Sequence, residues 1–146
     1  MILCNWRLYT KDIKDIKDIK DIDIYKSSVS SSMSFSEHVM EYAGKTYTIY
    51  CGKDAKNNDE LLDECEPEDI WFHVANQSSG HVVLKNEEKS TVKKVPRQVI
   101  KRCACICKAS IRASGKCEII YTERKNITKT STLGRVITEN VKTITV

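Results

Sequence analysis

Residues 69–84, DIWFHVANQSSGHVVL, decide the fold of this chain. Two runs rich in β-branched and aromatic residues flank a polar loop, which is the pattern of two strands joined by a turn. Because side chains alternate along a strand, the isoleucine, phenylalanine and valine of the first run share one face, which we expect in the core. The opposite face carries Asp69, Trp71 and His73, and His81 opens the second run. That polar and aromatic face is a catalytic site, a docking surface or a structural cluster.

Strand and helix signals on both sides of this stretch outline one domain. Pro96 opens an expected helix of about four turns, at the first helical position that proline tolerates. Acidic residues support a short helix at 57–65, since the helix dipole favours them near its start. Further strands are expected at 45–52, 117–122, 142–146 and, more weakly, 136–138. The mixed order predicts an α+β fold, a largely antiparallel mixed sheet packed by one long and one short helix.

The first 34 residues differ from the rest of the chain. Residues 11–23 read KDIKDIKDIKDID, a period of three that matches neither a strand nor a helix, and SSVSSSMS follows. We expect residues 1–34 to be a disordered, low-complexity tail and residues 35–146 to be the folded domain. A short interaction tail is the alternative, and Met33 and Met40 are alternative starts.

Composition narrows the class of protein. Charged residues make up 30% of the 146 residues, no apolar run approaches membrane-spanning length, and the N-terminus lacks the apolar region of a signal peptide. We therefore expect a cytoplasmic protein that does not contact membranes. The seven cysteines are an odd number, which argues for reduced thiols rather than a disulfide framework.

Charge divides the chain into two unlike halves. Residues 1–84 contain 9 basic and 15 acidic residues, whereas residues 85–146 contain 15 basic and 5 acidic ones. On the expected long helix, four cations lie on the side opposite the apolar residues: Arg97, Lys101, Lys108 and Arg112. Such a stripe can follow a phosphate backbone, and the alternative is an ordinary solvated face.

Catalysis and metal binding have weaker support in the sequence. CACIC at 103–107 has a C-x-C-x-C spacing within one helix, which directs Cys105 away from the other two thiols and favours packing over zinc. Asp69, His73 and His81 could form a hydrolytic or metal cluster, but no nucleophile motif or phosphate-binding glycine loop accompanies them. We expect no enzyme activity, no metal and no cofactor.

Several motifs together resemble a known family. YTIYCGKDAKNNDELL, PEDIWFHVANQSSGHVVL, the proline-led helix and IIYTERKNITKTSTLGRVITENVKTITV are similar to the NFACT-R domain, over residues 46–146. This module occurs in ribosome quality control factors of the NEMF and RqcH kind and also in small stand-alone proteins. The larger domains and the coiled coil of the long members have no counterpart here, so their tailing of stalled peptides is not carried over.

The resemblance implies a non-catalytic module that binds RNA, such as tRNA or rRNA, or the ribosome, and DNA is a second candidate. Two alternatives stay open: an adaptor that docks on ribosomal or other proteins, and a metal-dependent nucleic-acid enzyme that uses Asp69, His73 and His81. Trp71 would either stack on a base or ribose or pack beneath the sheet. The oligomeric state is left open. The expected nucleic-acid-binding residues are Lys53, Trp71, His73, His81, Arg97, Lys101, Lys108, Arg112, Lys125 and Lys129.

Overall fold

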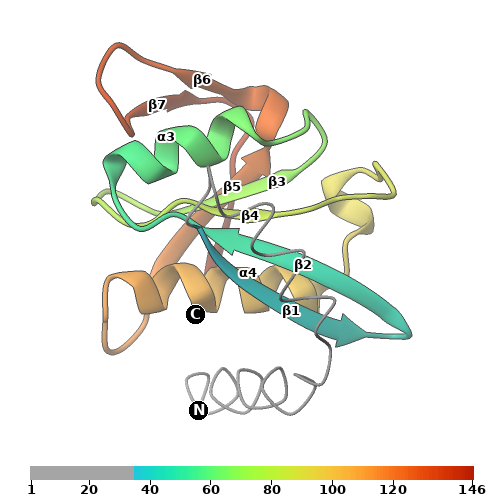
Figure 1. Cartoon of the computed structure of the whole chain (residues 1–146). Helices are drawn as coiled ribbons and strands as arrows, with labels where there is room; N and C mark the ends of the chain where they lie inside the picture. Colours follow the sequence, from blue (N-terminus) through green and yellow to red (C-terminus); the bar gives the residue numbers. More distant parts are fainter. Residues whose placement is uncertain (1–34) are drawn as a thin grey trace, which may run out of the picture.

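A computed structural model describes residues 35–146, and the expected tail, residues 1–34, lies outside them. A six-stranded sheet separates two layers (Figure 1). Helix α4 covers one face, and helix α3 with a two-stranded hairpin covers the other. The helices are α3 (Ala55–Asp63) and α4 (Arg97–Ser110), and two short 3-10 turns are η1 (Val92–Lys94) and η2 (Arg124–Asn126).

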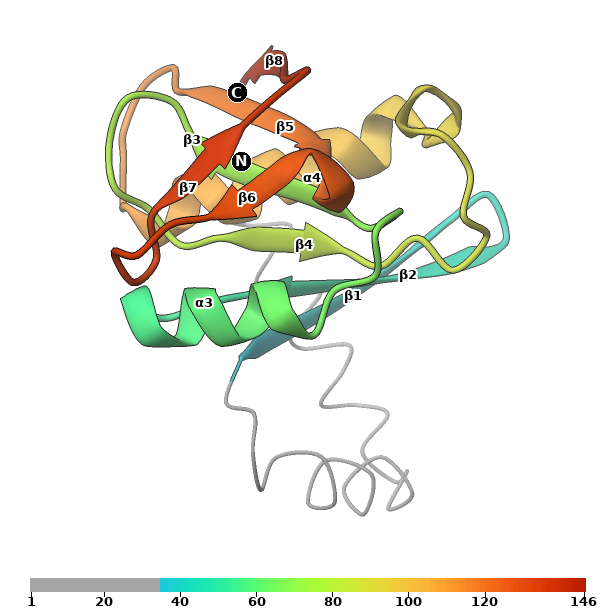
Figure 2. The same ribbon diagram turned by 90° about the horizontal axis from the view of Figure 1, so that it is seen from above.

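The sheet is antiparallel throughout, with the strand order β1-β2-β4-β3-β5-β8. Its strands are β1 (Ser36–Tyr42), β2 (Lys45–Cys51), β3 (Ile70–Val74), β4 (Val82–Leu84), β5 (Glu118–Glu123) and β8 (Lys142–Thr145). The separate hairpin is β6 (Ile127–Lys129) with β7 (Val136–Thr138), and Figure 2 shows it beside α3 over the same face. The α+β prediction is confirmed, including one long and one short helix.

Strand β1 was not among the expected elements. It pairs along its whole length with β2, and Met40 lies opposite Tyr47. The two-residue turn between them places Ala43 at φ 53° and Gly44 at φ 80°. Positive φ at both central residues is the geometry of the tight hairpin turns that match strand twist. Met40 therefore lies inside a paired strand.

Strand β3 separates two apolar cores. Phe72 faces α4 and is 0% exposed, in a core that also contains Ile49, Val82 and Ile119. Trp71 faces the other way, is 1% exposed, and packs in a second core built from Leu61, Leu62, Val83 and Ile127. The aromatic and polar face expected from the sequence is therefore covered at Trp71 by α3 and the hairpin.

Helix α3 is fixed at its start by two side chains. The N-cap Asp54 accepts a 2.8 Å hydrogen bond from the Asn57 main-chain N–H, which satisfies one of the free donors of the first turn. Asn58 Oδ1 accepts from the His81 N–H at 3.0 Å and so joins α3 to the start of the β4 segment. Gly52 makes this approach possible, because a Cβ there would lie 2.0 Å from that oxygen.

Helix α4 differs from the expected helix at both ends. Pro96 is its N-cap, so Arg97 is the first helical residue, and the helix ends at Ser110. Arg112 follows in a turn with φ 52° and is not part of the helical stripe. Cys105 is 5% exposed, and it lies outside the core cluster that contains Cys103 and Cys107. Neither helix of residues 35–146 has the length and apolar content needed to cross a bilayer.

Candidate nucleic-acid interface

A cleft of about 820 Å³ opens at the end of the sheet where β2 finishes. Four segments form its walls: the start of α3, the β3–β4 loop, the end of α4 and the β6–β7 loop. These are residues 53–55, 76–80, 110–111 and 132–135. Because segments distant in sequence meet only after folding, the cleft could not be read from a local pattern.

Hydrogen bonds to side chains hold the β3–β4 loop in place. Ser79 Oγ accepts from the Val74 N–H at 3.1 Å, and Ser110 Oγ accepts from the Gly80 N–H at 3.1 Å. Ser110 ends α4, so this wall of the cleft is tied to both the sheet and the long helix. A Cβ at Gly80 would lie 2.8 Å from the Gly52 carbonyl oxygen, which requires glycine there.

Three aromatic rings form the floor of the cleft. Trp71 and His73 stack with centroids 5.5 Å apart and planes at 12°. His81 meets Trp71 edge-on at 5.4 Å and His73 edge-on at 5.1 Å. Trp71 and His81 are each 1% exposed, whereas His73 is half-buried. The surface that a ligand can reach is therefore mainly the imidazole of His73, with the other two rings packed against it.

Both histidines are neutral at physiological pH. Burial lowers the pKa of His73 from its ordinary 6.5. Burial, followed by repulsion from His73, lowers the pKa of His81 to about 3, despite an opposing hydrogen bond to the main chain of Gly134. A neutral imidazole presents one N–H and one lone pair, so the floor carries hydrogen-bonding groups without net charge.

Two polar atoms of this floor lack a partner. Among buried side-chain nitrogen and oxygen atoms of residues 35–146, Trp71 Nε1 and His81 Nδ1 alone make no hydrogen bond. Buried polar groups in folded proteins are almost always paired, and each exception asks for an explanation. Here both atoms belong to side chains that line the same cleft.

Cations and neutral polar side chains surround the floor. Lys53 and Arg135 are exposed and line the cleft from the start of α3 and the adjoining β6–β7 loop, and Asp54 contributes one carboxylate. The Lys53 N–H donates to Asn57 Oδ1 at 2.9 Å, which fixes the main chain of the lysine at the start of α3. Arg112 follows directly after Ile111, which lines the wall. Such a rim can hold phosphates while the polar loop contacts sugars or bases.

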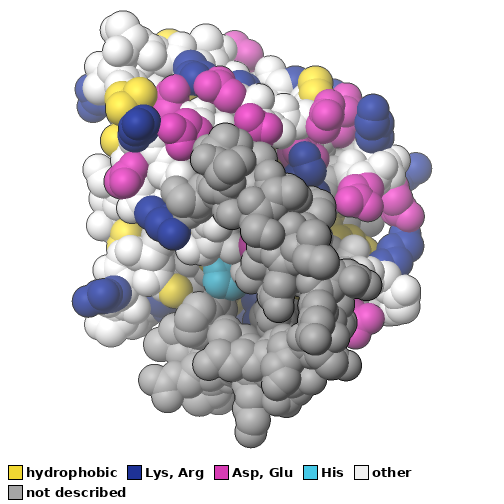
Figure 3. All heavy atoms as spheres, viewed as in Figure 1, with side chains coloured by type: hydrophobic (Ala, Val, Ile, Leu, Met, Phe, Trp, Pro, Cys, Tyr) yellow, Lys and Arg dark blue, Asp and Glu magenta, His cyan; other side chains and the backbone are white. Residues whose placement is uncertain are grey.

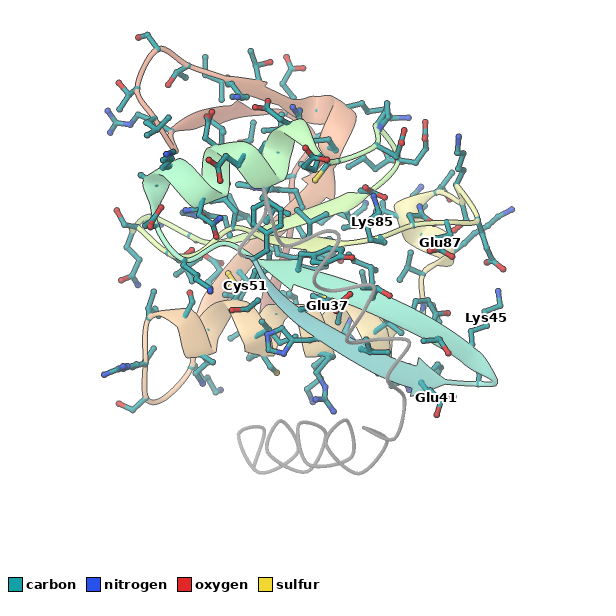
Figure 4. The ribbon with its side chains drawn as sticks, viewed as in Figure 1. Glu37, Glu41, Lys45, Cys51, Lys85 and Glu87 are labelled. Carbon is teal, nitrogen blue, oxygen red and sulfur yellow. The ribbon has the colours of Figure 1, made fainter. Side chains whose placement is uncertain are left out.

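Asp69 is not part of the histidine cluster. Its carboxylate accepts from the Lys85 ammonium at 2.8 Å, the Asn86 N–H at 2.9 Å and the Glu66 N–H at 2.8 Å. Cys51 and Lys85 lie at opposite ends of β4, apart from each other in Figure 4, and the cleft lies at the Cys51 end. The grouping of Asp69 with His73 and His81 is therefore wrong: Asp69 fixes the segments around β3 and β4.

The other predicted cations are dispersed. Arg97 and Lys101 are exposed on α4, without an ion pair among the described residues. Lys108 donates to the main-chain carbonyls of Gly115 and Val146. On the visible part of one face, basic and acidic side chains are interspersed (Figure 3). The structure thus does not assemble all four helix cations into one free stripe.

Two lysines near the β6–β7 hairpin also have acidic neighbours. Lys125 lies 3.8 Å from Glu123, and Lys129 lies 2.7 Å from both Asp59 and Asp63 of α3. Lys129 thereby ties the hairpin to α3 instead of extending toward a ligand. Of the ten predicted residues, the cleft brings together Lys53, Trp71, His73 and His81.

The described residues contain no cluster of three histidine, cysteine, aspartate or glutamate side chains with the arrangement of a metal site. Burial raises the pKa of the Cys107 thiol to about 12, and Cys103 and Cys105 are shifted in the same direction. These thiols pack in the core and remain protonated at neutral pH.

Sequence reasoning missed the polar part of the cleft. Asn76, Gln77 and Ser78 line it from the β3–β4 loop, and Arg135 lines it from the β6–β7 loop. The available signal was the run NQSSG between two buried strands, because loops carried by a rigid sheet commonly hold binding residues.

Comparison with solved structures agrees with this fold. The C-terminal part of a fibronectin/fibrinogen-binding protein from Streptococcus suis superimposes with a TM-score of 0.66, over 79% of this chain and 46% of that one. The sequence identity is 23%, so the likeness concerns the fold alone.

Similar sequences come from distant organisms. Coiled-coil domain-containing protein 25 of Mus musculus is 39% identical over 89 residues, which are 59% of this chain and 43% of that protein. Protein JLP2 of Saccharomyces cerevisiae is 36% identical over 89 residues, or 57% of this chain and 43% of that protein. The match thus spans less than half of either relative. The NFACT protein RNA binding domain matches residues 34–140, and the chain belongs to that family.

Proposed function

We propose that this domain binds RNA without catalysing a reaction, and that the cleft is its contact surface. The observation that carries the proposal is the composition of the cleft in a member of an RNA-binding family. Lys53 and Arg135 stand on the rim, neutral amide and hydroxyl side chains line the β3–β4 loop, and two uncharged histidines form the floor. This is the arrangement expected of a site that takes a nucleotide from an unpaired strand.

The rim and the floor have separate tasks in this proposal. The two cations hold phosphates of the backbone, which provides affinity without reading sequence. Trp71 supports the floor from beneath, since a side chain that is 1% exposed cannot stack on an incoming base. His73 is the ring that a nucleotide meets.

The RNA we propose is tRNA or ribosomal RNA, in the cytoplasm. The resemblance to modules of ribosome quality control factors supports this choice. DNA competes for the same rim, because phosphates do not distinguish the two nucleic acids.

Two double variants test whether RNA binds at the cleft or along helix α4. Lys53→Ala with Arg135→Ala removes the rim cations, and Arg97→Ala with Lys101→Ala removes two exposed cations of α4. All four side chains are exposed, so neither variant should lose measurable stability. Binding of purified bulk tRNA would be measured by fluorescence anisotropy over a range of salt concentrations.

We expect the rim variant to bind tRNA at least tenfold more weakly. Its plot of log affinity against log salt should flatten by roughly 0.7 to 0.9 for each cation removed. The α4 variant is the matched control and should bind nearly as the parent. Unchanged binding by the rim variant at every salt concentration would refute the cleft as the contact surface.

Helix α4 is the second candidate surface. Arg97 and Lys101 are exposed and make no ion pair among the described residues. If only the α4 variant weakens tRNA binding, the contact runs along this helix. If neither the parent nor a variant binds nucleic acid, the adaptor hypothesis takes precedence.

A further inference from the structure

The floor of the cleft presents an unpaired hydrogen-bond acceptor, so a ligand that binds there must supply a donor. His73 Nδ1 lies 2.7 Å from the Val74 carbonyl oxygen, and because a carbonyl only accepts, Nδ1 carries the proton. The lone pair of the same ring is therefore on Nε2, which has no hydrogen-bond partner within residues 35–146. A phosphate oxygen, which also only accepts, cannot satisfy it.

The neighbouring rings add one donor and one further acceptor. His81 hydrogen-bonds the main chain of Gly134, and its Nδ1 has no partner, so Nε2 carries the proton and Nδ1 is the lone pair. Trp71 Nε1–H is an unpartnered donor. Each unpaired polar group that is buried destabilises the folded protein. A ligand meets His73 Nε2 first, because Trp71 Nε1 and His81 Nδ1 are buried behind it, so a group that donates to His73 and can also accept from the Trp71 N–H suits this set of atoms.

We propose that the cleft floor binds the 2′-hydroxyl of a ribose and thereby makes the domain prefer RNA to DNA. A hydroxyl donates and accepts, whereas an exocyclic amino group only donates and a phosphate only accepts. The hydroxyl lies next to the phosphates of its own strand, which the rim cations Lys53 and Arg135 hold. This inference rests on the proposed function and adds to it the sugar that the site selects.

Three labelled oligonucleotides of one base test the inference in the wild-type chain. They are an oligouridylate, its deoxyuridine counterpart and its 2′-O-methyl counterpart, each about 12 nucleotides long, within the site sizes of single-strand binders. The deoxy strand lacks the hydroxyl. The 2′-O-methyl strand keeps the ribose shape but cannot donate a hydrogen bond.

In anisotropy titrations we expect the wild type to bind the ribose strand roughly 3- to 10-fold more tightly than either counterpart, as one hydrogen bond allows. His73→Phe keeps a ring on Trp71 and removes the lone pair, so the preference should fall to about one. Its affinity for the deoxy strand should fall less than its affinity for the ribose strand, because the deoxy strand has no 2′-hydroxyl to lose a partner. His38→Phe is the matched control, because His38 is a half-buried histidine of β1 that does not line the cleft.

Several results would overturn the inference while the proposed function stands. These are equal wild-type affinity for all three strands, equal affinity for the ribose and 2′-O-methyl strands, or a preference that survives His73→Phe in a protein with a normal circular dichroism spectrum. A preference for one base that is independent of the sugar would assign the floor to a base edge instead. The wild-type comparison decides even if the variant fails to fold. Binding of no oligonucleotide and no tRNA would overturn the proposed function as well.

Discussion

Asp69 and Trp71 lie two positions apart on the same face of one strand segment, yet they stabilise different parts of the molecule. Asp69 is 1% exposed, and its carboxylate accepts three hydrogen bonds from the segments before β3 and after β4. Trp71, also 1% exposed, fills the core between the sheet and α3. Substitutions at the two positions should therefore have separable effects.

Trp71→Ala should lower the free energy of unfolding by roughly 3 to 5 kcal/mol, because it leaves a large cavity beneath α3 and the hairpin. Urea denaturation followed by circular dichroism measures this. Trp71→Phe, which keeps most of the volume, should cost clearly less. A Trp71→Ala protein as stable as the parent, with weaker RNA binding, would instead place the indole at the ligand.

Asp69→Ala should cost roughly 3 kcal/mol of stability, since it leaves the Lys85 ammonium and two main-chain N–H groups without their carboxylate. tRNA binding at a temperature where the variant is folded should match the parent. The same sample should be assayed for RNA cleavage with added Mg²⁺, Mn²⁺ or Zn²⁺. A metal-dependent cleavage by the parent that Asp69→Ala abolishes would restore the enzyme hypothesis.

His81 should make the domain sensitive to acid. Its pKa is about 3 in the folded state and 6.5 ordinarily, so below pH 6.5 the unfolded state binds a proton that the folded state does not. Stability is thus full above about pH 6.5 and declines toward pH 3, by at most about 1.4 kcal/mol per unit. Urea midpoints at pH 7 and pH 5 measure the loss. His81→Phe should lose less between the two pH values, and an equal loss would contradict this linkage.

At the scale of elements, β1 is the informative case. SEHVMEY has weak alternation and two glutamates, so its pattern does not identify a strand, whereas the Ala43 and Gly44 turn followed by a clear strand was a usable signal. The period-two pattern of residues 70–74 did place Phe72 in the core correctly. It could not show that Trp71 is buried too, because the cover comes from α3 and the β6–β7 hairpin.

Helical periodicity had a similar limit. It correctly placed Val99, Ile100 and Cys103 in the core, since the apolar face of an amphipathic helix packs on the sheet. The pattern could not show where the helix stops or which cations find partners. Arg112 lies beyond the end of α4, and Lys108 binds carbonyls that other segments bring to it. The cleft, built from four separate segments, was likewise outside the reach of local patterns.

Two truncations test the contribution of β1. A chain that begins at residue 35 should melt within about 2 °C of the full chain, because the repeat and serine run have the composition of a segment that buries little apolar surface. A chain that begins at Met40 loses the first four residues of β1 and their pairs with β2, so it should melt at a clearly lower temperature. Differential scanning calorimetry compares them. A large drop for the first truncation would show that the tail packs on the domain.

At the scale of the whole molecule, the acidic and basic halves of the chain meet at two places. In the sheet, β1 to β4 lie together and pair with the basic half where β3 meets β5, and α3 from the acidic half lies next to the hairpin from the basic half. Lys129 pairs with Asp59 and Asp63 at that contact. Some basic residues of 85–146 therefore form ion pairs within the protein. For this reason the net charge of this half overestimates the number of cations that can bind phosphates.

The burial of the cysteines gives the domain an intrinsic chemical reporter of its own unfolding. Six of the seven cysteines lie in residues 35–146, five of them buried and Cys65 partly so, and burial raises the pKa of Cys51 to about 11 and of Cys65 to about 12. Alkylating reagents attack thiolates, so the native domain should react slowly and each opening event should expose several reactive groups at once. In a chain that begins at residue 35, which lacks Cys4, the count of modified thiols by mass spectrometry would then report the fraction of molecules that have opened, even in a crude cell extract.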